Sequence, residues 1–303
     1  MEHKPFYSHG KLLISGEYVV LDGALSLAIP TKYGQYLAIE SLEESKLIWK
    51  SFDENGIIWF EDTFLIEKNG TSRTPRNELS DRLIQILNAA KDLNPDFLND
   101  NKGIKVKTHL EFPKNWGLGT SSTLINNVAQ WADVDAYTLL EKTFGGSGYD
   151  IACAQNNSSI TYKTNNKNQI VKTVDFNPSF KEHLYFVHLN KKQNSRDGIK
   201  DYYKNKVNAQ SAIDAITTIT LKMINSKTLR DFQSLMIQHE SIISNITKQT
   251  PVKEILFKNF EGAIKSLGAW GGDFIMVASK SNPSQYFIDK GYKTIISYSN
   301  MVL

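Results

Sequence analysis

The stretch Glu111–Val128, EFPKNWGLGTSSTLINNV, constrains the fold of this chain more than any other part of it. A strand-like run ends there, two glycines follow, and a helix-like run begins behind three hydroxyl residues. Such a turn places backbone N–H groups at a helix N-terminus, where an anion can bind. Gly117 and Gly119 let backbone approach a ligand without a Cβ in the way. A glycine turn whose Ser or Thr side chain caps the helix is the alternative.

The three hydroxyl residues are Thr120, Ser121 and Ser122. Each can cap the helix or turn its hydroxyl to a phosphate or to Mg²⁺. The stretch is not a Walker A loop, because no Gly-Lys-Ser/Thr follows the glycines. It is not a Gly-x-Ser-x-Gly elbow of a hydrolase either.

The composition is that of a globular protein with enough chain for a large core. The 303 residues, 41% of them hydrophobic and 22% charged, suggest two domains. A net charge of +3 with scattered lysines predicts no nucleic-acid partner. The single cysteine, Cys153, excludes an internal disulfide and fits a reducing compartment. No apolar run reaches the roughly 18–20 residues of a membrane span, and the N-terminus lacks a signal-peptide pattern, so we expect no membrane partner and a cytoplasmic location.

The first part of the chain is predicted to be rich in strands, which are runs of β-branched and aromatic residues between turn residues. The runs are KLLISGEYVVL, YGQYLAIES, KLIWKSF, GIIWFEDTFLI and GIKVKTHLEF. An amphipathic helix is expected at Asn77–Leu93, and two short helices are expected around FGGSGYDIACAQ. SSITYKTNNKNQIVKTVDF is typical of a hairpin that turns at NNKN.

The later part is predicted to be rich in helices. After a strand, HLYFVHLN, helical spacing runs through 197–224, 229–246 and 251–265. A strand DFIMVAS, a short helix and a strand YKTIISYS follow. Strands followed by helices indicate an α+β protein. We place a domain boundary near FNPSF, which gives domains at 1–177 and 178–303.

Three further stretches carry glycines beside charged residues. Gly10–Tyr18 contains Lys11, a compact charge suited to a phosphate, although a surface lysine at a strand start is the plainer interpretation. Gly145–Ala152 presses Asp150 against a tight backbone, where it either caps a short helix or orients an acceptor hydroxyl for phosphoryl transfer. Gly268–Asp273 lies between a helix-like and a strand-like run.

Taken in order, these stretches resemble the motifs of the GHMP kinases, the superfamily of galactokinase, homoserine kinase, mevalonate kinase and phosphomevalonate kinase. The matching segments are GKLLISGEYVVLDGALSLAIP, PKNWGLGTSST, GSGYDIA and KSLGAWGGD, with phosphomevalonate kinase the most similar. The resemblance implies an α+β fold of two domains: an N-terminal domain like domain 2 of ribosomal protein S5 and a ferredoxin-like C-terminal domain. It also implies ATP and Mg²⁺ as cofactors and a small-molecule substrate, and it leaves monomer and homodimer open.

The resemblance implies roles for individual residues. Asp150 and Lys11 match the catalytic aspartate and the lysine beside it. The ATP phosphates would be held by Gly117, Leu118, Gly119, Thr120, Ser121 and Ser122. Mg²⁺ would be held by Ser121 or Ser122, with Glu141 as a further candidate. The expected substrate-binding residues are Glu17, Ser147, Gly148, Lys192, Ser195, Arg196, Gly268, Gly271 and Gly272.

Three departures from the family pattern bear on these roles. Leu139 stands where mevalonate kinase has a metal-binding glutamate, and Glu141 is the nearest carboxylate. Trp270 replaces a small residue in the last glycine loop, where it crowds a ligand or stacks on one. Thr123 replaces the usual alanine. For Lys192, Ser195 and Arg196, a solvated basic turn before a helix is the alternative interpretation.

The function predicted from these stretches is transfer of the γ-phosphoryl group of Mg-ATP to a small anionic acceptor, phosphomevalonate first and mevalonate second. Sugars and homoserine remain open acceptors, because fold and loop do not fix the substrate. A non-catalytic nucleotide- or metabolite-binding regulator is an alternative from another class. Its expected signature is loss of Lys11 or Asp150, and both are present. A diphosphomevalonate decarboxylase is disfavoured by the GSGYD aspartate.

Overall fold

The computed structural model describes residues 4–67, 70–72, 77–99, 103–165, 168–193, 195–206 and 209–303. The chain forms two compact units, each built from separate stretches of sequence. Unit 1 comprises residues 1–10, 33–114 and 119–155, and unit 2 comprises residues 11–32, 115–118 and 156–303. The predicted domain boundary at 177/178 remains a prediction.

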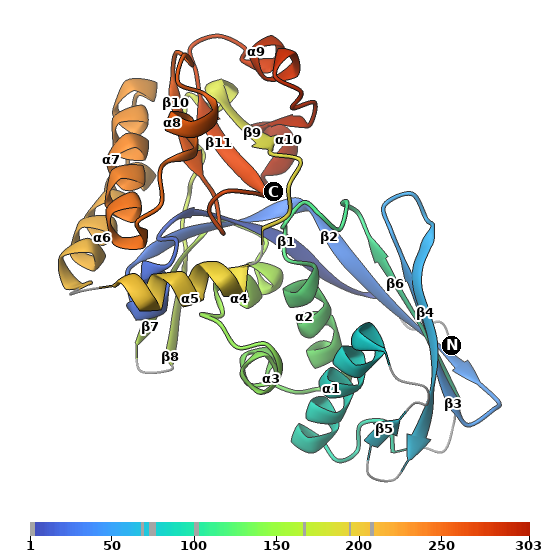
Figure 1. Ribbon diagram of the computed structural model, residues 1–303. Coiled ribbons are helices and arrows are strands. Elements are labelled where there is room, and N and C mark those ends of the chain that lie inside the picture. The colour runs from blue at the N-terminus through green and yellow to red at the C-terminus, as the bar shows by residue number, and fades with distance from the viewer. Residues whose placement is uncertain are drawn as a thin grey trace. The chain divides into compact units, whose positions relative to one another are not determined.

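Unit 1 is a sheet with helices on one face (Figure 1). Its strands are β3 (Lys46–Phe52), β4 (Ile58–Glu67), β5 (Gly70–Ser72), β6 (Gly103–Leu110), most of β2 (Ser26–Leu42) and the start of β1 (Phe6–Ser15). Its helices are α1 (Glu78–Leu93), α2 (Thr120–Ala132), α3 (Ala136–Thr143) and α4 (Tyr149–Gln155).

The strand order in unit 1 is β5-β4-β3-β6-β2, with β1 pairing to β2. β3 and β6 run parallel, whereas β3–β4, β4–β5 and β2–β6 are antiparallel. Alternation in β3 buries Leu47, Trp49 and Ser51 on one face. The core behind that face joins Trp49 and Phe64 to the apolar sides of α1 and α2, so the predicted amphipathic helix at 77–93 is confirmed as α1, capped by Asn77.

Unit 2 contains a second sheet, formed by β9 (Leu184–His188), β10 (Ala263–Ser266), β11 (Phe274–Ala278) and β12 (Ile295–Ser297). The unit also contains β7 (Ile160–Asn165) and β8 (Asn168–Thr173), which extend the first sheet beyond β2. Its helices are η1 (Val19–Asp22), η2 (Lys181–His183), α5 (Ser195–Asn205), α6 (Gln210–Ile224), α7 (Leu229–Thr247), α8 (Val252–Leu256), α9 (Ser284–Asp289) and α10 (Tyr298–Met301).

The sheet order β10-β11-β9-β12 is antiparallel throughout. Helices lie between β9 and β10 and between β11 and β12, which gives the β-α-β-β-α-β order of a ferredoxin-like fold. The predicted α+β class with a ferredoxin-like second half is therefore confirmed. The hairpin of β7 and β8 pairs with the start of β2, Ser26 opposite Tyr162.

Three predicted elements differ from those observed. The strand expected over 11–21 ends at Ser15, because Gly16 and Tyr18 turn the chain with φ of 100° and 64°. The helix expected over 197–224 is two helices, since α5 ends at Asn205, a poor helix former. The helix expected over 251–265 ends at Leu256, and residues 263–266 pair with β11 as a strand, which overrides their helical spacing.

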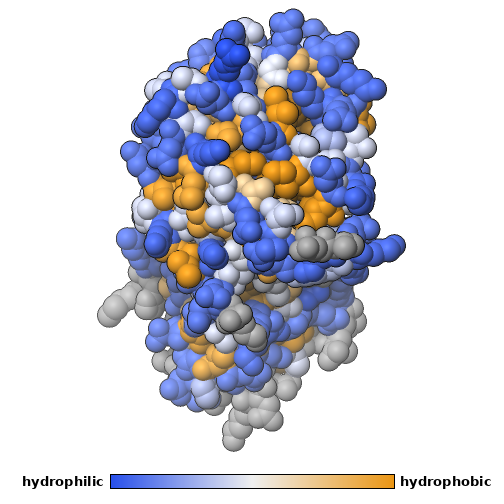
Figure 2. All heavy atoms as spheres, turned by 90° about the vertical axis from the view of Figure 1, so that its left-hand side faces the viewer, coloured by the Kyte–Doolittle hydropathy of each residue, from blue (hydrophilic) through white to orange (hydrophobic). Residues whose placement is uncertain are grey.

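Helices α6 and α7 lie side by side in unit 2 (Figure 1). Figure 2 looks onto the side that carries them and shows hydrophobic residues among charged ones. Leu221 of α6 and Ile237 of α7 are about half exposed, at 49% and 54%. Among the described residues, none of the helices combines the length and hydrophobicity needed to cross a bilayer.

Candidate functional site

In unit 2 the first part of the glycine loop is held by Lys11. The Lys11 side chain donates to the carbonyl oxygen of Gly117 over 2.8 Å, and the Lys11 backbone N–H donates to the carbonyl of Leu118 over 2.9 Å. Lys11 is half-buried at the middle of β1, and Leu118 is fully buried. The structure therefore brings two predicted site residues, Lys11 and Gly117, into direct contact.

The same loop is anchored to the second sheet. His188, at the end of β9, donates through Nε2 to the carbonyl of Asn115 over 3.0 Å, while its Nδ1 accepts from Asn190 N–H. The Trp116 ring meets Phe274 of β11 edge-on, with centroids 5.4 Å apart. These contacts fix residues 115–118 against β9 and β11.

Asp273 lies directly on Gly117. The backbone of Asp273 has φ of 53° and is tied to the stretch after β9, because Asp273 N–H donates to the Lys191 carbonyl over 2.7 Å. Its carboxylate accepts from Gln193 N–H over 3.1 Å. Burial raises the pKa of this carboxyl, against the opposing effects of the Gln193 N–H and of Lys11. Sequence reasoning missed Asp273, Gln193 and His188; the only available signal was the GGD end of the last glycine stretch.

In unit 1 the second part of the loop opens helix α2. Gly119 is the N-cap, with φ of 95°, and no described side chain caps the helix there. The first backbone N–H groups of a helix have no partner within it. They also lie at the positive end of the helix dipole. This N-terminus therefore offers hydrogen-bond donors and positive potential to an anion.

The two candidate serines differ in their surroundings. Ser121 is exposed, whereas Ser122 is buried, and its hydroxyl donates to the carbonyl of Gly119 over 2.9 Å. Thr123 is buried, with its Oγ 3.1 Å from the same carbonyl. Ser122 therefore shapes the turn, and Ser121 is the serine with a hydroxyl that solvent reaches.

Asp150 lies in the first turn of α4 and is half-buried. Its carboxylate is 3.2 Å from the N–H of Ile151. Gly148 is buried with φ of 86°, a left-handed conformation that excludes most side chains, and Ser147 beside it is half-buried. Glu141 lies exposed in the last turn of α3.

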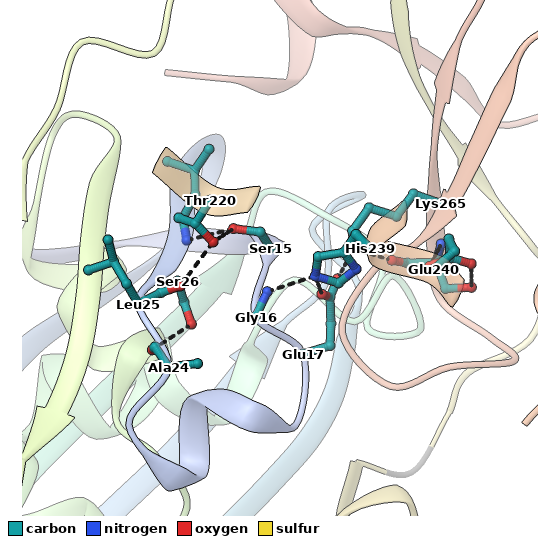
Figure 3. Close-up of polar contacts among 12 residues, drawn as sticks. Ser15, Gly16, Glu17, Ala24, Leu25, Ser26, Thr220, His239, Glu240 and Lys265 are labelled. Atoms are coloured by element: carbon teal, nitrogen blue, oxygen red, sulfur yellow. Dashed lines mark hydrogen bonds and ion pairs between the residues drawn. The ribbon is translucent and has the colours of Figure 1, made fainter. Parts of the chain in front are cut away.

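Glu17 is fully buried in unit 2 within a cluster of ionisable side chains, shown in Figure 3. One carboxylate oxygen of Glu17 forms an ion pair with Lys265 of β10. The other lies 3.1 Å from Nε2 of His239 in α7, and that nitrogen is 3.0 Å from Gly16 N–H. A neutral ring can serve only one of them, as donor to Glu17 or as acceptor from Gly16. Burial opposes ionisation of Glu17, but Lys265 and His239 outweigh it and lower its pKa.

The cluster continues into α7 and β10. Burial lowers the pKa of His239 to about 4 and, with Lys265 opposing it, raises that of Glu240 to about 8. Glu240 accepts from Ser266 N–H over 3.1 Å and from the Ser266 hydroxyl over 3.2 Å. At neutral pH one ion pair, Glu17 with Lys265, thus lies among two neutral groups.

The remaining predicted residues lie around the last glycine loop of unit 2. Gly268 and Gly271 have φ of 62° and 90°, and a Cβ on Gly272 would lie 2.8 Å from the Lys191 carbonyl. Lys192 is exposed and follows Lys191, whose carbonyl oxygen lies beside Gly272. Ser195 and Arg196 belong to the first turn of α5, but their side chains lie outside the described part of the structure.

Trp270, the bulky residue of this loop, is turned inward and 2% exposed. Its backbone N–H donates to the Tyr18 hydroxyl over 3.3 Å. The Tyr18 ring stacks on Tyr202 of α5, with centroids 5.8 Å apart. Trp270 is therefore part of the packing of unit 2 in this structure.

No three His, Cys, Asp or Glu side chains within the described residues gather as a ready-made metal site. Mg²⁺ in nucleotide sites usually keeps several waters and is bound by one or two protein groups and the phosphates. An exposed serine hydroxyl in the first turn of a helix, beside uncapped N–H groups, fits such a site. The donor set around Ser121 is thus compatible with Mg²⁺ carried by a nucleotide.

Comparisons with known proteins identify the fold. No protein-family model matches the sequence, and no curated protein sequence matches it either. Solved structures do match over nearly the whole chain. Mevalonate kinase of Methanococcus jannaschii has a TM-score of 0.73 at 15% identity and covers 97% of each chain.

Two further matches were solved with small molecules bound. Phosphomevalonate kinase of Streptococcus pneumoniae, in complex with phosphomevalonate and AMPPNP, has a TM-score of 0.68 at 13% identity and covers 95% of each chain. Galactokinase of Lactococcus lactis, complexed with galactose, has a TM-score of 0.69 at 12% identity, covering 97% of this chain and 92% of its own. The predicted fold, that of the GHMP kinases, is confirmed over the whole chain. The sequence identities to these structures, 12–15%, are too low to identify the substrate.

Proposed function

We propose that the protein is an ATP-dependent small-molecule kinase that phosphorylates a small anionic acceptor, with phosphomevalonate as the first candidate and mevalonate as the second. The observation that carries this proposal is the Gly117–Ser122 segment. Its glycines take left-handed conformations and lead into an uncapped helix N-terminus, which suits a polyphosphate. The same segment has its carbonyl held by a lysine, in a fold shared with small-molecule kinases.

In this proposal each residue has a physical task. ATP supplies the transferable phosphoryl group, and Mg²⁺ bound to ATP neutralises part of the charge on the phosphates. The backbone of Gly117, Leu118, Gly119 and Thr120 would hold the phosphates, and the Ser121 hydroxyl would help to hold the Mg²⁺. Lys11, fixed by the Gly117 carbonyl, adds positive charge where two anions meet. Asp150 orients the acceptor group, which for a phosphate acceptor needs little deprotonation at neutral pH.

The acceptor assignment is supported by charge and by the motifs. An anionic acceptor suits Lys192 and Arg196, and the loop of Gly268, Gly271 and Gly272 admits a ligand close to backbone. Two of the structurally similar kinases have the acid mevalonate or its phosphate in their names, whereas the galactokinase was solved with a sugar. We therefore rank acids ahead of sugars as acceptors.

The test is ADP release from Mg-ATP by the purified protein with mevalonate, phosphomevalonate, homoserine or galactose. Asp150→Asn should abolish turnover, and Asp92→Asn, an exposed carboxylate in the last turn of α1, should not. Turnover on phosphomevalonate that disappears only in Asp150→Asn supports the proposal as stated. Turnover on a sugar or on homoserine retains the kinase and corrects the acceptor.

If none of the four acceptors gives ADP release, and calorimetry still shows Mg-ATP binding, the result would favour the non-catalytic regulator. That alternative predicts that Asp150→Asn leaves nucleotide affinity unchanged. The kinase predicts the same, so turnover decides between them. If the wild-type protein neither releases ADP with any acceptor nor binds Mg-ATP, the proposal is wrong.

A further inference from the structure

Helix α2 buries amide side chains where a helix against a core would carry apolar ones. Asn126 and Asn127 are at most 1% exposed, yet they follow Ile125 in the packed face of the helix. Ser8 of β1, also fully buried, lies between them. Buried polar groups cost stability unless they are hydrogen-bonded, so this group needs an explanation beyond packing.

The side chains form one chain of hydrogen bonds within unit 1. Gln155, the last residue of α4, donates through Nε2 to Asn126 Oδ1 over 3.1 Å. Asn126 Nδ2 donates to the Ser8 hydroxyl over 2.8 Å, and Ser8 donates to Asn127 Oδ1 over 2.7 Å. Asn127 Nδ2 then donates to the backbone carbonyl of Gln35 in β2 over 2.9 Å.

Every donor in this chain points the same way, from α4 through α2 to β2. The sequence of donors and acceptors fixes the orientation of both amides. A flipped Asn126 would oppose its NH₂ group to the Gln155 donor, and a flipped Asn127 would oppose its oxygen to the Gln35 carbonyl. Aligned hydrogen bonds in a low-dielectric interior polarise one another and become stronger. The chain thus holds its members in one arrangement.

A second branch reaches the glycine loop. Thr123 Oγ is 2.7 Å from Gln35 Oε1 and 3.1 Å from the carbonyls of Gly119 and Thr120. The backbone carbonyl of Gln35 therefore belongs to the first branch and its side chain to the second. Through Gln35, the first turn of α2 is connected to the end of the helix that carries Asp150.

We propose that Gln155 and Asn126 are positioning residues for Asp150, and that this hydrogen-bonded chain sets helix α4 against the phosphate-binding end of α2. The inference rests on the proposed phosphoryl transfer. A carboxylate that orients an acceptor must be held in place relative to the donor phosphate, and a displacement of about 1 Å can cost about a hundredfold in rate. Gln155 sits at the exposed end of the chain, so it can be changed without opening the core.

The experiment compares three substitutions of Gln155 with the wild type. Gln155→Ala and Gln155→Glu remove the donor to Asn126, whereas Gln155→Lys keeps a donor of similar reach. We expect the first two to lower kcat by about tenfold with the KM for ATP within about twofold, and Gln155→Lys to retain most of the rate. Gln85→Ala, an exposed glutamine of α1 that bonds α3, is the matched control and should change neither constant.

The charge series makes the result specific. If Gln155 acts as a hydrogen-bond donor, Gln155→Ala and Gln155→Glu should share a lowered kcat, and the kcat of Gln155→Lys should be close to that of the wild type. A graded series from Lys through Ala to Glu would show an electrostatic effect on ligand binding. An equal rise of KM in all three would show a loss of ligand binding that does not depend on the donor. Either result would overturn the proposal. Unchanged kinetics in Gln155→Ala would overturn it as well.

Amide hydrogen exchange gives a readout that does not depend on turnover. Gln155→Ala should speed exchange in α4 while α1 keeps its wild-type rates, and the melting temperature should change little. Equal exchange in α4 overturns the positioning role. If the wild-type protein phosphorylates no acceptor, the proposed function fails by itself, and the exchange of α4 still decides whether this chain of hydrogen bonds holds the helix.

Discussion

Asp273 rests against Gly117 so closely that a Cβ on the glycine would lie 2.5 and 2.8 Å from the two carboxylate oxygens. Lys11 holds the carbonyl of the same glycine. Two charged side chains from distant parts of the sequence therefore fix one residue of the loop. A glycine is required there for two reasons, its φ of 69° and the contact with the carboxylate.

Gly117→Ala should therefore destabilise the protein by more than backbone strain alone. Gly56 is a control with the same kind of strain, since its φ is 76° and nothing lies within 4 Å of an added Cβ. We expect the free energy of unfolding to fall about 1–3 kcal/mol further for Gly117→Ala than for Gly56→Ala. In an Asp273→Ala background this difference should vanish, which chemical denaturation can measure; a difference that persists would show that the carboxylate is not its cause.

The two serines should separate into a ligand role and a structural role. Ser122→Ala removes a buried hydroxyl bonded to Gly119 and should lower the free energy of unfolding by about 1 kcal/mol. Ser121→Ala, at an exposed position, should change it by less than about 0.5 kcal/mol. It should instead raise the Mg²⁺ concentration that gives half-maximal ADP release. The reverse pattern would assign the metal to Ser122.

Glu17 is predicted from the family resemblance to contact the substrate, and its buried pairing makes a second expectation testable. Lys265→Met leaves the Glu17 carboxylate buried without its cation, which should cost about 3–5 kcal/mol of unfolding free energy. The double variant Glu17→Gln/Lys265→Met should recover part of this loss, and Lys222→Met, on the exposed side of α6, should have little effect. A near-normal stability of Lys265→Met, with a raised KM for the acceptor, would instead favour the substrate role.

The buried cluster also predicts how stability depends on pH. His239 has its pKa lowered from 6.5 to about 4, so its contribution is complete above pH 6.5 and is lost as pH falls towards 4. Glu240 has its pKa raised from 4.5 to about 8, so the folded state holds a proton that the unfolded state has released, and stability falls as pH rises between these values. Between pH 4.5 and 6.5 the two effects oppose each other.

From pH 6.5 to 8 only the Glu240 effect of this pair remains. We expect the unfolding free energy to fall there by up to about 1.4 kcal/mol per pH unit. Glu240→Gln should flatten that slope, and denaturation at several pH values is the measurement. A wild-type slope that survives in Glu240→Gln would show that other groups titrate in this range.

Local sequence patterns predicted the elements that depend on local order. β3 occupies the run KLIWKSF, and α1 differs from its predicted range by one residue, because alternation and helical spacing there agree with burial. The helix predicted over 251–265 was wrong in its second half, where β-pairing decided the outcome. Residues 263–266 are a strand only because β11 lies beside them, and no short stretch of sequence contains that information.

The site divides in the same way. Glycines and hydroxyls adjacent in sequence marked the phosphate loop, since the whole loop is one continuous segment. The partners of that loop were not predictable, because Asp273 lies more than 150 residues along the chain from Gly117. The role of the buried amides of α2 could not be predicted either, because their partners Ser8 and Gln155 come from other elements.

The pairing of Glu17 with Lys265 has a consequence for biosynthesis. The two residues are 248 positions apart, and at about 5–20 residues per second the ribosome needs about 12 to 50 s to make the intervening chain. Unit 1 draws on nothing beyond residue 155, so it can fold within that interval. The segment 11–32 belongs to unit 2, and its contacts with Thr217, Thr220 and His239 can form only after those residues have been made.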